Sequence, residues 1–266
     1  MSRQLPRNSS TPKGGARPSG GPIGFNNPNV QRLRRLLGRR SARHDEGAFV
    51  IEGPGLVAEA VAAGWPIEAQ FVAPGGTPVA GAGPAYDLAP GVLERIAGTE
   101  SPQPLLAIAS IVGHELTTIA GATFVVVCAG LSDPGNLGTI IRTCEAAGAD
   151  AVVLLAGSVD CWNPKVVRSS AGAVFHVPVV GPISGDDLDA LGLPLIGTSS
   201  HAVQSYTDFD FSAPFALVLG NEAHGLDGAV RCAETVSIPH RGRSESLNVA
   251  MAAAVISFEA ARQRSI

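Results

Sequence analysis

Three short segments in the C-terminal half of the chain are unusually rich in Gly, Asn, Glu and Ser. Each lies beside an apolar run of strand length: residues 130–142, 219–226 and 238–254. In a parallel sheet, ligands bind at the carboxyl ends of strands, where loops meet helix N-termini. Polar segments at three such ends therefore predict a ligand-binding site. The sequence contains no cluster of His, Cys and Asp that would indicate a metal as the ligand.

The first segment, residues 130–142, reads Gly-Leu-Ser-Asp-Pro-Gly-Asn-Leu-Gly-Thr-Ile-Ile-Arg and links an apolar run to an amphipathic helix. Gly135 and Gly138 permit close approach of a backbone, and Asn136 is a candidate N-cap. Arg142 falls about one and a half turns into the helix. Any βα unit can turn in this way, and the dinucleotide fingerprint Gly-x-Gly-x-x-Gly is absent. Taken alone, this segment does not identify a ligand.

The second segment, residues 219–226, reads Leu-Gly-Asn-Glu-Ala-His-Gly-Leu and again follows an apolar run. Its Glu222 follows a strand end and is not expected to be a core residue, so it is a candidate site residue. A solvated turn carboxylate is the alternative interpretation. The third segment, residues 238–254, brings Ser246 and Asn248 to the start of an Ala-rich helix. Ser246 there is a candidate N-cap, which would be a purely structural role.

Apolar periodicity predicts the elements that hold these segments. In the first half we expect helices and strands over 29–42, 48–51, 54–64, 69–72, 90–97 and 105–111. In the second half we expect strands 124–129, 151–155, 177–180, 194–198, 215–219 and 235–238, and helices 137–148, 164–171, 184–191 and 247–263. Alternating strands and helices predict an α/β fold with a mostly parallel sheet covered on both faces.

Charge is distributed very unevenly along the chain. The net charge is −4, yet residues 1–44 contain ten Lys or Arg and no acidic residue. Such an asymmetry is typical of a polyanion-binding arm, and a solubilising tail is the alternative. Leucines spaced to pack among the arginines favour a basic helix held against a domain, so we expect these side chains to contact RNA phosphates: Arg32, Arg34, Arg35, Arg39, Arg40 and Arg43.

Composition indicates three regions and a reduced protein without membrane spans. Residues 1–28 are rich in Gly, Pro, Ser, Asn and Arg and are predicted to be a disordered basic tail. A small α/β domain over 29–113 and a second domain over 120–266 follow. The four cysteines show no paired spacing, which indicates a cytoplasmic protein with thiols in its core. The apolar runs are too short for a transmembrane helix, and the N-terminus does not resemble a secretory signal.

Together the three segments resemble the motifs of the SpoU/TrmH family of RNA 2′-O-ribose methyltransferases, part of the SPOUT superfamily. These motifs are Asn-x-Gly-x-x-x-Arg, Gly-Asn-Glu-x-x-Gly-Leu, and Ile-Pro followed by Ser-Leu-Asn-Val-x-Ala-Ala. The resemblance covers about residues 120–264. Residues 30–112 resemble the ribosomal-protein-like substrate-binding domain of the rRNA-directed members, which include 23S rRNA and thiostrepton-resistance methyltransferases.

The resemblance implies a fold, a cofactor, an assembly and a set of roles. The fold is a mostly parallel sheet with a deep trefoil knot, and members pair as homodimers through the knot region. S-adenosyl-L-methionine would lie in the knot against the backbones of Leu219, Gly220, Ile238 and Leu247. The catalytic cluster would be Asn136, Arg142, Glu222, Ser246 and Asn248, and no metal is needed.

The role of Arg142 has two interpretations. The family favours an arginine as the base that deprotonates the ribose hydroxyl, but a guanidinium is normally always protonated. Clamping a phosphate and stabilising the developing alkoxide is the easier task. In either role we expect Arg142 to point into the cofactor cleft and not into solvent.

The resemblance implies 2′-O-ribose methylation of RNA, with 23S rRNA as the substrate. The same reaction on tRNA is an alternative, although those members tend to lack a globular N-terminal domain. A non-catalytic RNA-binding protein with this fold is a second alternative, but Arg142, Glu222 and Asn248 are all present. A nucleotide-binding oxidoreductase is disfavoured because the dinucleotide fingerprint is missing.

Overall fold

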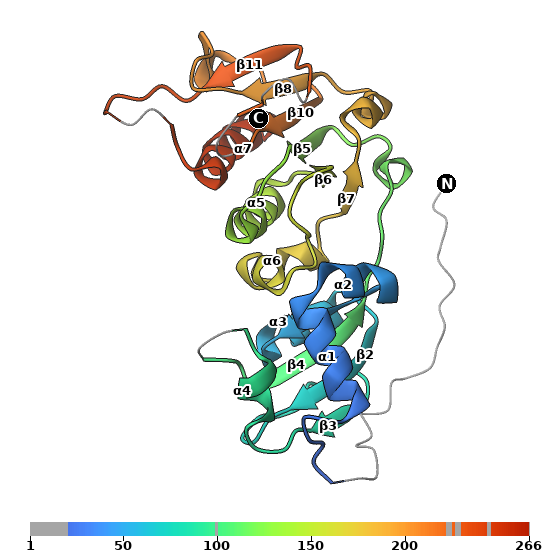
Figure 1. The fold of residues 1–266 in the computed structure, drawn as a ribbon. Helices are drawn as coiled ribbons and strands as arrows, with labels where there is room; N and C mark the ends of the chain where they lie inside the picture. The colour runs from blue at the N-terminus through green and yellow to red at the C-terminus, as the bar shows by residue number, and fades with distance from the viewer. Residues whose placement is uncertain (1–20, 99–100, 222–224, 227–229, 244–245, 266) are drawn as a thin grey trace. The chain divides into compact units, whose positions relative to one another are not determined.

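The computed structural model describes residues 21–98, 101–221, 225–226, 230–243 and 246–265. The chain forms two compact units, drawn in Figure 1. Unit 1 comprises the described residues up to Gly38 and Val50–Ser110, whereas unit 2 comprises Arg39–Phe49 and Ile111–Ile266. Within the described residues, no helix is long and apolar enough to cross a membrane.

Unit 1 is built on a four-stranded mixed sheet. Its strand order is β1 (Ala48–Glu52), β4 (Leu105–Ser110), β2 (Ile67–Val72) and β3 (Ala85–Asp87). β2 runs antiparallel to β4 and parallel to β3. The helices are α1 (Pro28–Gly38), α3 (Pro54–Ala62) and α4 (Val92–Ile96). α1 buries Val30, Leu33 and Leu36, whose spacing of three residues places them on one helical face.

The basic helix expected over 29–42 is instead two helices. α1 ends at Gly38, and α2 (Arg40–Glu46) follows it in unit 2. Arg39 between them has an extended backbone, with φ −126° and ψ 119°. Glycine at the end of α1 favours the break, because it stabilises a helix less than other residues except proline. The prediction was therefore wrong in treating all the arginines of this region as one surface.

Residues 23–25 differ from the disordered tail expected over 1–28. Ile23 is bridged to Leu88, and its backbone also exchanges hydrogen bonds with Asp87 and Ala89, at 2.8 and 3.0 Å. The guanidinium of Arg95 lies 3.8 Å from the centre of the Phe25 ring. These contacts order a segment whose composition alone favoured disorder, while residues 1–20 of the expected tail lie outside the described residues.

Unit 2 contains a seven-stranded sheet in which every paired strand is parallel to its neighbour. The strand order is β7 (Val179–Ile183), β6 (Ala151–Leu155), β5 (Phe124–Cys128), β10 (Phe215–Leu219), β8 (Leu195–Thr198), β11 (Glu234–Ser237) and β9 (Gln204–Ser205). The mostly parallel sheet expected from the sequence is confirmed, and the two-residue β9 is an addition to it. Because the strands are parallel, their carboxyl ends share one edge of the sheet.

Helices cover both faces of this sheet. One face packs against α5 (Pro134–Ala147), which lies between α6 (Pro164–Ser169) and α7 (Val249–Arg264), as Figure 1 shows. Alternate residues of the central strands, such as Val125 and Val127, point to the other face. There they pack against 3₁₀-helices at Leu116–Ile119 and Gly185–Leu191. The second of these replaces the α-helix expected over 184–191.

The cysteines occupy the interior, as expected for core thiols. Cys128, Cys144 and Cys161 are buried and Cys232 is half-buried, and all four are free. Burial raises the pKa of the Cys144 and Cys161 thiols, so both stay protonated.

Candidate active site

The residues expected to hold a cofactor lie around the carboxyl ends of two strands. Leu219 is buried at the end of β10 and Gly220 follows it, whereas Ile238 is half-buried just after β11. β8 separates these two strands, so their ends are about 10 Å apart, which is twice the spacing of adjacent strands. Leu247 is 42% exposed just before α7.

Main-chain groups at these positions are available for a ligand. In the described part of the chain, the backbones of Gly220, Ile238 and Leu247 form no hydrogen bond with other residues. The carbonyl of Leu219 differs, because it accepts from the Ala129 N–H at 2.8 Å. Unpaired N–H and C=O groups at a sheet edge can read the edge of a flat heterocycle, since they provide both donors and acceptors.

A carboxamide pair joins the first and third segments. Asn248 Nδ2 donates to Asn136 Oδ1 at 3.0 Å, across 112 residues of sequence. Asn248 Oδ1 also accepts from the N–H groups of Ala250 and Met251, at 2.9 and 3.3 Å, and so caps α7. Asn248 is thus both the N-cap and the link between the segments, while Ser246, expected as the N-cap, is exposed outside the helix.

The N-cap of α5 also differs from the sequence prediction. Asp133 caps the helix by accepting the Asn136 N–H at 2.8 Å, and this bond lowers the pKa of its carboxyl. Asn136 is therefore inside the helix, where its side chain accepts the bond from Asn248. Gly138 serves helix packing, because a Cβ atom there would lie 1.9 Å from Ser169 Oγ on α6.

The second segment is a tight loop tied to the first. Asn221 Nδ2 donates to the carbonyl of Gly130 at 2.6 Å, and two backbone bonds of 2.7 and 2.9 Å join Asn221 to Gly225. A Cβ atom on Gly220 would lie 2.2 Å from the carbonyl carbon of Gly225, so only glycine fits there. Glu222 lies outside the described residues.

Arg142 is exposed on α5 in the single chain. Within the described residues it has no ion pair and no hydrogen bond. The expectation that it points into a cleft and away from solvent is therefore wrong for the isolated chain, because the neighbouring Ile141 and Thr143 face the interior and the helical period turns Arg142 outward. An exposed, unpaired guanidinium is free to meet a polyanion.

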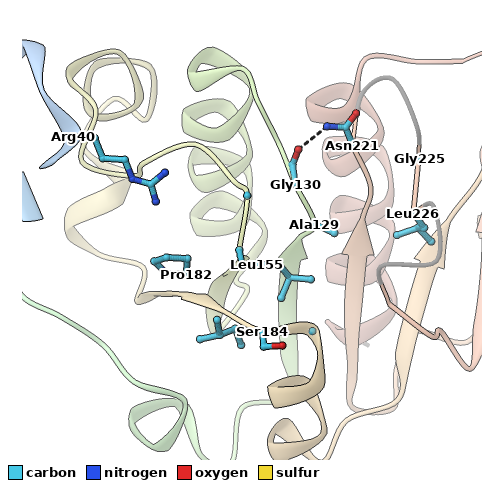
Figure 2. Close-up of a pocket in the computed structure, with 13 residues that line it drawn as sticks. Arg40, Ala129, Gly130, Leu155, Pro182, Ser184, Asn221, Gly225 and Leu226 are labelled. Atoms are coloured by element: carbon cyan, nitrogen blue, oxygen red, sulfur yellow. Dashed lines mark hydrogen bonds between the residues drawn. The ribbon is translucent and has the colours of Figure 1, made fainter.

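A pocket of about 720 Å³ adjoins the first and second segments within unit 2. Figure 2 shows Arg40 on one side of it and Leu226 on the other, with Leu155 and Pro182 among the lining residues. The ends of β6 and β7 supply much of this lining, and no sequence motif marks them. Their residues are ordinary apolar and small types, which carry no chemical signal until the fold places them together.

The arginines expected to bind RNA fall into different environments. Arg43 is only 3% exposed, and its Nε lies 2.7 Å from Asp160 Oδ2. That part of the prediction is corrected, because a buried, paired guanidinium is not available to RNA. Arg32 pairs with Glu68 at 2.6 Å and remains partly exposed. The remaining arginines are exposed: Arg34, Arg35, Arg39 and Arg40.

Comparison with known proteins extends over both units. Residues 123–258 match the model of the SpoU rRNA Methylase family, and residues 27–107 match that of the MRM3-like substrate binding domain. The chain is 34% identical to the 23S rRNA (uridine(2479)-2′-O)-methyltransferase of Streptomyces viridochromogenes, over 95% of this chain and 96% of that protein. It is 39% identical to the 23S rRNA (guanosine(2553)-2′-O)-methyltransferase RlmP of Bacillus subtilis, over 65% and 71% of the two chains.

Solved structures agree with these relatives. The crystal structure of the SpoU methyltransferase AviRb from Streptomyces viridochromogenes, in complex with AdoMet, matches with a TM-score of 0.82. It is 34% identical, and the match covers 90% of this chain and 99% of that one. An AdoMet-bound rRNA methyltransferase from Sinorhizobium meliloti matches with a TM-score of 0.79, 29% identity and coverage of 91% and 98%. With its three motif segments gathered at one sheet edge, the chain belongs to the SpoU rRNA methylase family.

Proposed function

We propose that the protein transfers a methyl group from S-adenosyl-L-methionine to a ribose 2′-hydroxyl of 23S rRNA. The observation that carries this proposal is the joining of the three motif segments by two carboxamide contacts, Asn248 to Asn136 and Asn221 to Gly130. The substrate is inferred from the relatives, which are 23S rRNA methyltransferases, and from the substrate-binding domain at residues 27–107. A protein with this substrate works in the cytoplasm.

The residues at the sheet edge fit the cofactor. Unpaired main-chain groups of Gly220, Ile238 and Leu247 can bind an adenine edge, and the exposed Leu247 side chain can cover one face of the ring. When bound, S-adenosyl-L-methionine supplies a methyl group on a positively charged sulfur. No group of three or more metal-ligating side chains occurs in the described residues, and the proposed transfer needs no metal.

The chain's own residues would orient the ribose and stabilise its oxygen. The ribose hydroxyl loses its proton as it attacks, so negative charge develops on the oxygen. Arg142 is assigned the stabilisation of this charge and of the adjacent phosphate. Asn136 and Asn248 hold the first and third segments in register, with Ser246 beside them. Glu222 is proposed to orient Arg142 or Asn136.

The first expected result concerns the cofactor and the reaction. Calorimetry should show one S-adenosyl-L-methionine site per chain, and Gly220→Ala should abolish it because the added Cβ cannot fit against Gly225. Gly113→Ala is a control, since that glycine of unit 2 has open space around it and no positive φ. Mapping of 2′-O-methyl positions in rRNA, with and without the gene, tests the reaction. Unchanged maps together with no cofactor binding to the folded protein would contradict the proposal.

We also propose that two copies pair through α7. Three large apolar side chains are exposed along it at spacings of four and three residues, which places them on one helical face: Met251, Val255 and Phe258. Exposed apolar patches of this kind mark interfaces, and α7 begins at the motif segment itself. The occupant is a second copy, because the commonest oligomers are symmetric dimers in which one patch meets itself.

Phe258→Glu is therefore expected to convert a dimer into a monomer. The substitution would place two carboxylates in an apolar interface related by twofold symmetry. Light scattering with size-exclusion chromatography measures the outcome. Val203→Glu is the matched control, because Val203 is fully exposed and lies outside α7. A monomeric wild-type protein at micromolar concentration would show that this face serves another purpose.

A further inference from the structure

The pocket of unit 2 is lined by both apolar and polar residues. Leu155, Pro182 and Ile183 supply apolar surface, and Arg40 and Ser184 supply polar groups. Its volume of about 720 Å³ falls within the range of roughly 300–1,000 Å³ that is typical of small-molecule sites. The pocket is thus large enough for one nucleotide with its phosphate.

The pocket lies on the opposite side of β10 from Ile238, the expected cofactor residue that follows β11. Its lining comes from the carboxyl ends of β5, β6 and β7, whereas β8 and β11 lie beyond β10 in the sheet. The two sites share only the loop that ends β10, where Asn221 donates to Gly130, both of which line the pocket. A ligand in the pocket would therefore lie beside the methyl-transfer centre without competing for the cofactor's positions.

Arg40 stands at the rim of this pocket on a helix that is firmly held. Arg43, three residues later in α2, makes the buried ion pair with Asp160, and Trp162 packs against Phe49 with ring centres 4.7 Å apart. With the described residues Arg40 makes one long hydrogen bond, from Nη1 to the Ser158 carbonyl at 3.5 Å. Among the described residues, no carboxylate pairs with Arg40. Its charge is therefore available to a ligand at the mouth of the pocket (Figure 2).

We propose that the pocket receives one unstacked nucleotide of the RNA substrate, with its base against Leu155, Pro182 and Ile183 and its phosphate on Arg40. This inference rests on the proposed function, which makes RNA the polyanion beside this site. A planar guanidinium matches two phosphate oxygens, and sequence-specific RNA recognition typically splays single-stranded bases out of the helix. Arg40 is thereby a substrate-binding residue that acts from unit 2, unlike the arginines of α1 in unit 1.

The decisive variant is Arg40→Gln, which removes the charge and keeps most of the side-chain length. In single-turnover methylation of unmodified transcribed 23S rRNA, the RNA concentration at half-maximal rate should rise about 10- to 100-fold, as expected when a hydrogen bond to a charged group is lost. Calorimetric affinity for S-adenosyl-L-methionine should not change. Arg231→Gln removes an equal charge from an exposed position of unit 2 outside the pocket. It should change the RNA concentration at half-maximal rate less than twofold.

A second variant tests the pocket independently of charge. Ala156 lines the pocket and is exposed, so Ala156→Trp should fill it and weaken RNA binding at least tenfold without unfolding the protein. Filter binding of the same transcript gives a readout that does not depend on methylation. If Arg40→Gln matches Arg231→Gln and Ala156→Trp matches wild type in both assays, the pocket does not bind RNA. Wild-type protein that binds the transcript at the pocket but never methylates it would instead contradict the proposed function alone.

Discussion

Replacement of Arg142 by alanine is expected to lower the single-turnover rate of methyl transfer by about 10²–10³, the usual effect of removing one preorganised donor. The fold should not change, because Arg142 is exposed and has no partner among the described residues. Its removal therefore leaves no buried charge behind. Tritiated S-adenosyl-L-methionine and the mapped rRNA provide the assay, and the thermal midpoint and cofactor affinity should match those of wild type.

Arg142→Lys separates charge from geometry. Lysine keeps the positive charge but cannot form the planar, bidentate contact of a guanidinium. If Arg142 clamps a phosphate and steadies the alkoxide, the lysine variant should also lose orders of magnitude in rate. Arg231→Ala is a control for loss of an exposed arginine in the same unit. An Arg142→Ala protein that transfers methyl groups at the wild-type rate would remove this residue from the mechanism.

The sheet of unit 2 could be predicted because its strands carry their own signal. Residues such as Val125, Val127 and Val218 form short apolar runs that only a sheet covered on both faces can bury. The polar segments then had to lie at the carboxyl ends of these strands. What the sequence could not show is which polar residue in a segment performs which task.

The helix caps illustrate this limit. Asp133 and Asn136 are both good N-cap residues, as are Ser246 and Asn248, and helical periodicity does not choose between neighbours three or fewer residues apart. Tertiary contact made the choice, since Asn136 and Asn248 bind each other across the two segments. The same limit applies to Arg43, whose partner Asp160 is 117 residues away. Nothing in a basic run distinguishes a buried arginine from an exposed one.

That buried pair leads to the largest effect expected on stability. Asp160→Asn should lower the free energy of unfolding of unit 2 by about 3–5 kcal/mol, the typical effect of leaving one buried charge without its partner. The main-chain N–H of Trp162 donates to Asp160 Oδ1 at 3.0 Å, and the carboxamide oxygen of an asparagine can still accept this bond. It cannot neutralise Arg43, which is 3% exposed. Chemical denaturation followed by Trp162 fluorescence in a Trp65→Phe background measures the change.

A partly exposed ion pair of the same length, in which Glu259 is 14% exposed, provides the control. Arg262 and Glu259 on α7 also approach to 2.7 Å, but the Arg262 side chain is 62% exposed. Exposed pairs contribute about 0–1 kcal/mol, so Glu259→Gln should have a small effect. The double variant Arg43→Met with Asp160→Asn should lose less free energy of unfolding than the sum of the two single variants. The reason is that the double variant removes both charges of the pair, whereas each single variant removes only one. If Asp160→Asn is no more harmful than Glu259→Gln, the pair does not anchor α2, and Arg40 is not held at the pocket by it.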